Sequence, residues 1–142
     1  MKQKILKFIF AFFLIPNFLI ANTNTNYFQE GIILFNDKKF EKAKFKFEQD
    51  IVFNPKNEMA YLYLAKIFNN LNDKNLEERN LKTVILLNPK NEEAIYNLAK
   101  LKLESSDYKQ SKKLNDRLTI LCDEYCAKSK KLKIEIDTLS KK

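Results

Sequence analysis

Two cysteines, Cys122 and Cys126, are the residues whose type and spacing could support redox or metal chemistry. Their C-x-x-x-C spacing differs from the C-x-x-C spacing of thiol oxidoreductases. A metal site would need further ligands, and the chain has no histidine. In an oxidising compartment an even number of cysteines favours a disulfide. The pair is therefore predicted to form a disulfide if the chain is exported, with free thiols and a redox site as alternatives.

Other kinds of catalysis find little support in the composition. The absence of histidine removes Ser-His-Asp and Cys-His catalysis. A single glycine in 142 residues excludes phosphate-binding and dinucleotide-binding loops, which need several. No carboxylate pair stands out in an apolar setting. We therefore expect a protein that is not an enzyme and that holds neither a cofactor nor a metal.

The N-terminal segment 1–21 is predicted to be a secretory signal peptide. A basic start (1–4) precedes an apolar run (5–15), and the small residue Ala21 stands before a purely polar stretch (22–26). Cleavage after Ala21 would leave 22–26 as a flexible mature N-terminus. The alternatives are a retained membrane anchor, which its central proline makes a poor spanning helix, and a buried helix. The segment predicts a periplasmic or secreted protein, or one anchored to the inner membrane and facing the periplasm.

The basic charge is modest and partly confined to the C-terminus. The formal net charge of +8 would fall to +5 if the three lysines of the signal segment were removed. Lysines gather in 128–142, either as a solvated face or as a contact for an anionic lipid or partner. Acidic residues interleave with them, so nucleic-acid binding is not expected.

A fixed sequence period organises the body of the chain. The pentapeptide Asn-Pro-Lys-Asn-Glu at 54–58 recurs at 88–92, and the same displacement relates Gly31, Ala65 and Ala99. A period of this size predicts a repeat array.

Within each period, apolar residues at steps of three and four predict two helices. Asn57, Asp73 and Asp107 are expected to cap helices. The residues before Pro55 and Pro89 are expected to end them, because a residue before proline avoids the helical region. A last helix is predicted over 124–139.

These residues resemble the tetratricopeptide repeat, a helix-turn-helix unit that has this period. With Asn24 as place 1, the small residue that the family has at place 8 falls on Gly31, Ala65 and Ala99. The resemblance covers about 24–123. It implies an all-α fold, an α-solenoid preceded by the signal peptide. The repeat body would span 27–123 and consist of three units, at about 24–57, 58–91 and 92–123. A capping helix with a basic tail (124–142) would follow it.

Several residues depart from the pattern of the family. They are polar or charged where the family has apolar or small residues: Glu30, Asp50, Glu77, Lys102, Ser111 and Asn115. For this reason the second helices of units two and three are expected to be shifted or tilted.

The resemblance also implies a binding surface. In this family the first helices of successive units line a concave groove that holds a peptide or a partner helix. Places 5, 9 and 12 of each unit would line it: Phe28, Ile32, Phe35, Leu62, Lys66, Asn69, Tyr96, Lys100 and Leu103. The aromatic and aliphatic residues of unit one could instead pack under the N-terminus or in a dimer, and the two lysines could serve solubility alone.

The expected role is therefore a protein-protein interaction scaffold or adaptor of the bacterial cell envelope. Its partner would be another protein or a peptide, and not a nucleic acid. Phe28 and Ile32 stand where the groove type that clamps acidic tails has Lys and Asn, which disfavours such tails. The alternative is a membrane-tethered assembly factor that touches the membrane through an uncleaved N-terminal segment or the basic tail.

Overall fold

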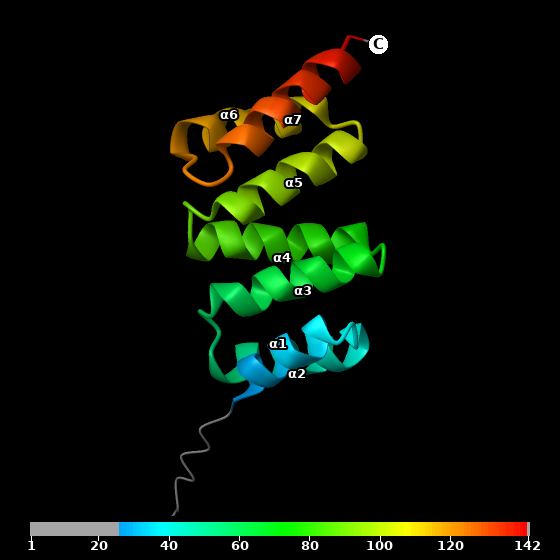
Figure 1. Ribbon diagram of the computed structural model, residues 1–142, viewed down its shortest axis with the longest axis vertical. Helices are drawn as coiled ribbons and strands as arrows, with labels where there is room; N and C mark the ends of the chain where they lie inside the picture. The colour runs from blue at the N-terminus through cyan, green and yellow to red at the C-terminus, as the bar shows by residue number, and fades with distance from the viewer. Residues whose placement is uncertain (1–25, 142) are drawn as a thin grey trace, which may run out of the picture.

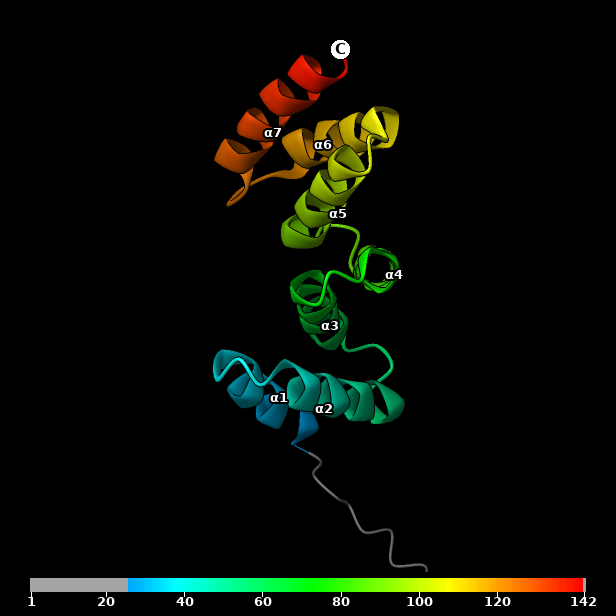
Figure 2. The ribbon, with the colours of Figure 1, turned by 90° about the vertical axis from the view of Figure 1, so that its right-hand side faces the viewer.

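Residues 26–141, the part of the chain that the computed structural model describes, form seven α-helices stacked along one long axis (Figure 1). They are α1 (Tyr27–Asn36), α2 (Phe40–Phe53), α3 (Glu58–Asn70), α4 (Lys74–Leu87), α5 (Glu92–Glu104), α6 (Tyr108–Leu121) and α7 (Cys126–Leu139). Figure 2 shows the α1–α2 pair at one end of the stack and α7 at the other. The predicted all-α stack of three helical pairs and a C-terminal helix is confirmed. The predicted signal peptide and residues 22–25 lie outside the described residues.

The second helices of the three pairs keep one register. α2, α4 and α6 are equal in length, and their bounds are displaced by one sequence period from each pair to the next. The helix ends therefore show no shift of α4 and α6 along the sequence, and their predicted tilt stays a prediction. The side chains of Asn57, Asp73 and Asp107 accept hydrogen bonds from backbone N–H groups in the first turn of α3, α4 and α6, which confirms the predicted caps.

The turn inside each pair also repeats. Lys38, Asn72 and Ser106 stand one period apart, and each has a left-handed backbone, with φ of 60°, 58° and 61°. The N–H of the residue after each of them bonds to a carbonyl five positions back, as in a Schellman motif. A Cβ atom makes the left-handed region costly, so glycine would be favoured at these three positions. The chain has lysine, asparagine and serine there instead.

Replacing Lys38 with glycine is expected to stabilise the fold by about 0.5–1 kcal/mol. The change removes the left-handed penalty of about 1–2 kcal/mol, and the greater freedom of glycine in the unfolded chain offsets part of the gain. Urea denaturation checks the sign. Lys42→Gly, at an exposed position inside α2, should instead destabilise by about 1 kcal/mol. A Lys38→Gly protein less stable than the parent would contradict the prediction.

Small residues sit at the helix crossings. Gly31, Ala65 and Ala99 are all buried, in α1, α3 and α5. Ala65 belongs to an apolar cluster that α3, α4 and α5 share, with Leu81 from α4 and Leu98 from α5 among its members. One helical pair therefore does not bury its apolar face alone, and successive pairs complete a continuous core.

Four of the departures from the family pattern are buried and hydrogen-bonded: Asp50, Glu77, Ser111 and Asn115. The Asp50 carboxylate accepts from the side-chain amides of Asn54 and Asn57, at 3.0 and 2.6 Å. It thereby ties the end of α2 to the start of α3. The Ser111 hydroxyl donates to the Ala99 carbonyl at 2.8 Å, between α6 and α5. Because buried polar groups without partners are costly, these bonds explain how the core tolerates Asp50 and Ser111.

Helix α7 covers the last repeat. Leu132 and Ile136 are buried against Ala99 and Leu103 of α5. The buried Asn115 amide of α6 donates to the carbonyl of Ser129 in α7 at 3.1 Å. The helix begins at Cys126, slightly later than the predicted start at 124. Within residues 26–141, no helix combines the length and the apolar character that crossing a membrane requires.

The predicted cysteine pair lies at the junction of α6 and α7. Cys122 and Cys126 are at disulfide-bonding distance, with Cα atoms 5.1 Å apart. The Glu92 carboxylate of α5 accepts hydrogen bonds from the backbone N–H groups of Asp123 and Tyr125, at 2.7 and 2.8 Å. The cysteine pair and the carboxylate therefore hold the same short connection onto the third repeat.

Candidate functional site

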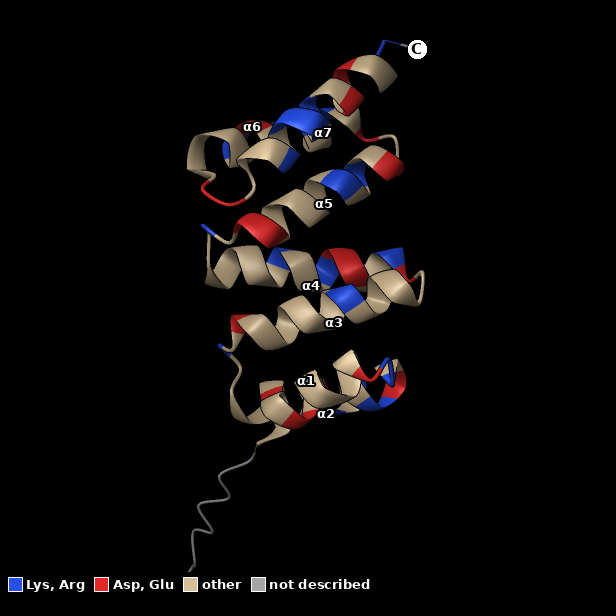
Figure 3. Ribbon diagram, in the orientation of Figure 1, with Lys and Arg blue, Asp and Glu red and all other residues tan. Residues whose placement is uncertain are grey.

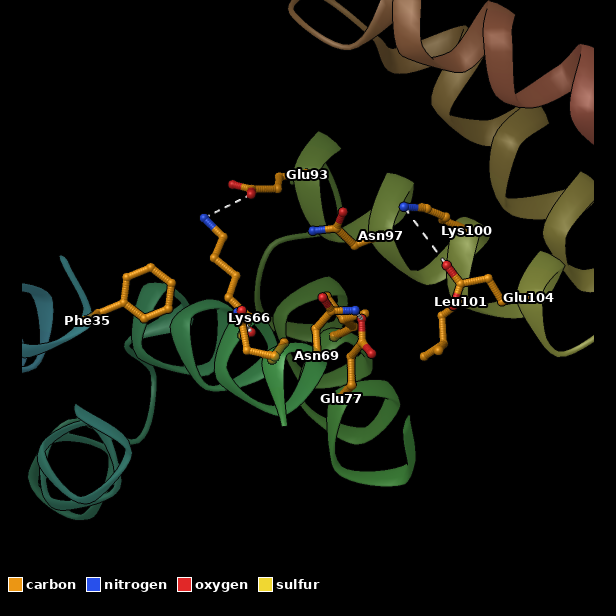
Figure 4. Close-up of a pocket in the computed structure, with 12 residues that line it drawn as sticks. Phe35, Lys66, Asn69, Glu77, Glu93, Asn97, Lys100, Leu101 and Glu104 are labelled. Carbon is orange, nitrogen blue, oxygen red and sulfur yellow. Dashed lines mark hydrogen bonds and ion pairs between the residues drawn. The ribbon is translucent and has the colours of Figure 1, made fainter. Parts of the chain in front are cut away.

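A pocket opens on the side of the stack formed by the first helices. Its volume is about 350 Å³, and residues of α1, α3, α4 and α5 line it (Figure 4). Three of the lining residues, Ala65, Leu81 and Leu101, are apolar and at most 4 % exposed, so they lie at the base of the pocket. The walls carry the following aromatic, charged and amide side chains: Phe35, Lys66, Asn69, Asn70, Glu77, Glu93, Asn97, Lys100 and Glu104.

Four of the nine residues predicted for the groove line this pocket. They are Phe35, Lys66, Asn69 and Lys100. Lys66 and Lys100 hold the same place in units two and three, which puts them on neighbouring first helices. The pocket therefore gathers residues from all three units, as a surface shared by stacked repeats must.

The residues predicted at place 5 all pack against other parts of the stack. Leu62 is only 1 % exposed and packs in the core with Leu98 of the next unit. Phe28 packs against Tyr63 of the next first helix, with ring centroids 6.0 Å apart. Tyr96 packs against Tyr125, just before α7, at 5.6 Å. Leu62 is therefore a core residue, while Phe28 and Tyr96 are half-buried between units, and their part in a groove stays a prediction.

Two further predicted residues are also engaged in packing. Leu103 is 7 % exposed and lies in the cluster that α5 forms with Leu132 and Ile136 of α7. Ile32 is partly buried against the core cluster shared by α2 and α3. The C-terminal helix therefore takes the position that Leu103 was predicted to offer to a partner.

The accessible face of α5 is rotated from the predicted one. It runs through Glu93, Asn97, Lys100 and Glu104, at steps of four, three and four. These are places 2, 6, 9 and 13 of the unit. Their polar character at helical spacing is a signal that the sequence carried, because such a stripe on an otherwise apolar helix must face solvent or a ligand.

Ion pairs hold the lysines of the pocket. The Lys66 ammonium lies 2.9 Å from the Glu93 carboxylate and 5.0 Å from the centre of the Tyr63 ring. Lys100 lies 3.9 Å from Glu104. Figure 3 shows basic and acidic residues interspersed along the stack, in keeping with these pairs. The pocket is therefore not the cationic groove that the two lysines alone would indicate.

Glu77 is the unusual residue of the pocket. It is 5 % exposed, and its Oε1 atom accepts a hydrogen bond from the Asn69 side-chain amide at 3.1 Å. Burial raises the pKa of its carboxyl group, and the Asn69 hydrogen bond opposes part of that shift. Nearby Glu104 raises this pKa further, while Lys74 and Lys100 lower it. The sequence alone marks Glu77 only as a departure from the repeat pattern.

An aromatic cluster forms one wall of the pocket. Phe35 packs edge-on against Tyr63 and Phe40, with centroids 5.1 and 5.5 Å apart. Tyr63 stacks on the buried Phe47 at 5.1 Å. Aromatic pairs at these distances contribute about 0.5–1.5 kcal/mol each beyond area burial. The cluster therefore makes this wall rigid. Phe35 is the residue of the cluster that lines the pocket.

Comparison with known proteins addresses the fold. No protein-family model and no curated protein matches the sequence. Solved structures do match, and three of them are 12–21 % identical. The first tetratricopeptide domain of Spaghetti, bound to an HSP90 peptide, is 16 % identical with a TM-score of 0.71, over 80 % of this chain and 90 % of that domain.

Two further solved structures are similar. The type III secretion chaperone SycD of Yersinia enterocolitica, in complex with a peptide of the translocator YopD, is 12 % identical with a TM-score of 0.73. The match covers 87 % of this chain and 97 % of that one. The tetratricopeptide domain of Arabidopsis OM64 is 21 % identical with a TM-score of 0.68, over 81 % and 92 %. The chain has the tetratricopeptide repeat fold.

Proposed function

We propose that this protein is a non-enzymatic scaffold or adaptor that holds a segment of a partner protein in the pocket between α3 and α5. The observation that supports it best is the pocket itself, because an apolar base with convergent amide and charged groups is what a peptide site requires. The peptide-bound Spaghetti and SycD domains show that this fold can hold peptides. We place the activity in the bacterial cell envelope, on the basis of the predicted signal peptide.

Filling the pocket is expected to abolish partner capture. Asn97→Trp would place an indole across the space between α3 and α5 without a change of charge. After crosslinking in an envelope extract, we expect this variant to recover at least tenfold less partner than the parent protein. Asn75→Trp is the matched control, because Asn75 is exposed on α4 and does not line the pocket.

Thermal melts of both variants, followed by circular dichroism, establish that they remain folded. If folded Asn97→Trp captures the same partners as Asn75→Trp, the pocket is not the binding site. The N-terminal sequence of the mature protein tests the alternative of a membrane-tethered assembly factor. A chain that begins near Asn22 supports the released form, and one that keeps residues 1–21 supports the tethered form.

A further inference from the structure

We propose that the pocket selects a partner segment that inserts an arginine or lysine side chain, whose cationic group is received by the Glu77 carboxylate. This inference rests on the proposed function, since it concerns which peptide the same pocket accepts. Its basis is the charge and the shape of the pocket.

The pocket holds one carboxylate more than it holds cations. Lys66 is paired with Glu93, and Glu104 is paired with Lys100 and with Lys74, at 3.9 and 3.7 Å, which leaves Glu77. Among the described residues, no basic group lies within ion-pair distance of the Glu77 carboxylate. An unpaired carboxylate at low exposure is costly, and a cation from outside would relieve that cost.

Glu77 also has bonding capacity to spare. Asn69 donates to Oε1, and within residues 26–141 no side chain or backbone group donates to Oε2. Figure 4 shows the Glu77 and Asn69 side chains next to each other among the pocket residues. A carboxylate accepts up to four hydrogen bonds, and the fork of a guanidinium or an ammonium group supplies such donors.

The shape of the pocket suits a long basic side chain. Ala65, Leu81 and Leu101 lie at the apolar base of the pocket, and Phe35 lies at one side (Figure 4). Lysine and arginine bury their methylene stems along apolar surfaces while the charged head meets polar groups. The Asn97 amide stands at the rim, where it can bond the backbone of an extended segment. An acidic side chain in the same position would face Glu77, Glu93 and Glu104.

Three lysines of the protein compete with an incoming cation, to different degrees. Lys74, which pairs with Glu104 at 3.7 Å, contributes an attractive charge toward Glu77 from the same helix. Lys66 is held by Glu93 at 2.9 Å and by the Tyr63 ring. Lys100 is held more loosely, at 3.9 Å from Glu104, and contributes an attractive charge toward Glu77. A Lys100 that swings onto Glu77 would remove the selectivity, so the experiment must be able to detect that outcome.

Titration with matched blocked peptides tests the inference. The probes are N-acetyl-Ala-Leu-Xaa-Leu-Ala-amide with Xaa as arginine, as citrulline or as glutamate. Citrulline has the shape of arginine without its charge. With the full chain, purified as the cell processes it, isothermal titration should give at least tenfold tighter binding for arginine than for citrulline. The glutamate peptide should bind weakest.

Glu77→Gln should reduce the preference for arginine over citrulline to within twofold. The substitution keeps the shape and the Asn69 hydrogen bond and removes a desolvated charge, so the variant should melt no lower than the parent. Glu48→Gln, at an exposed position on α2, is the matched control and should keep the full preference.

The dependence of binding on pH provides a second readout. Glu77 faces Asn69 from α3, Lys100 and Glu104 from α5, and Lys74 from its own helix. Burial raises its pKa, so acidification protonates it before ordinary glutamates. The affinity for the arginine peptide should therefore fall on acidification, before ordinary glutamates are protonated, and the Gln variant should lack this fall.

The outcomes separate this inference from the proposed function. Equal binding of arginine and citrulline peptides, or no binding of the arginine peptide at millimolar concentration, overturns the cation selectivity. If Asn97→Trp abolishes binding of both peptides while they bind the parent equally, the pocket still binds peptides and only the selectivity is wrong. If peptides bind and Asn97→Trp leaves their affinity unchanged, the pocket itself is wrong.

Discussion

Ala99→Asp is expected to remove the cooperative unfolding transition of this protein. Ala99 is fully buried in α5, against Leu103, Leu132 and Ile136. An aspartate there would bring a charge into an apolar contact, at a cost of several kcal/mol. A domain of this size has about 5–15 kcal/mol of total stability. The substitution therefore consumes most of the stability of the fold.

The measurement is a urea and thermal melt followed by far-ultraviolet circular dichroism. Lys100→Asp is the matched control, because it puts the same side chain at the next, exposed position. Ala65→Asp should be damaging but milder, since Ala65 borders the pocket and its new carboxylate could turn toward that space. A melt of Ala99→Asp within about 2 °C of the parent, a change of less than about 1 kcal/mol, would refute the tight crossing.

The helical framework was predictable because its signals are local and recur. The repeat period, the capping side chains and the prolines after α2 and α4 each act within one or two turns of the chain or recur from unit to unit. The left-handed turns at Lys38, Asn72 and Ser106 recur at the same period, although none of the three is glycine. They were not predicted, because the sequence around them shows no single residue type that demands this conformation.

The binding surface was only partly predictable, because it depends on contacts between units. Places counted inside one repeat do not reveal that Leu62 packs on the next unit, or that α7 covers Leu103. They do identify Lys66 and Lys100, which line the pocket. These places do not show how each first helix is rotated about its own axis. For α5, the polar stripe through Asn97 indicates that rotation.

The sequence shows which charged residues depart from the repeat pattern, but it does not show which residues they pair with. Lys102 pairs with Glu78 at 2.7 Å, between α5 and α4. Glu30 of α1 pairs with Lys46 of α2 at 2.6 Å. Both pairs join consecutive helices through residues more than 15 positions apart, so the spacing of residues within one helix does not connect them. Charged residues at usually apolar places therefore keep the register of the helices when a partner on the facing helix compensates them.

Gly31→Ala is expected to destabilise the protein by up to about 2 kcal/mol, although alanine is the better helix former. The helix gain is about 1 kcal/mol. A Cβ atom on Gly31 would lie 2.6 Å from Cε1 of Phe47 and 2.9 Å from its Cδ1 and Cζ. Phe47 is fully buried and stacks on Tyr63, so the ring has little freedom to move away. Overpacking of this kind costs about 1–3 kcal/mol, which outweighs the helix gain.

The second repeat suggests the compensating change. There the small residue is Ala65, and Leu81 stands at the place that Phe47 holds in the first repeat, in the same cluster. Phe47→Leu alone should destabilise by leaving a cavity, but it also makes room for a methyl group. In that background Gly31→Ala should therefore stabilise the protein or leave it unchanged. A double-mutant cycle by urea denaturation measures this coupling, and additive effects would show that the Gly31–Phe47 contact is not tight.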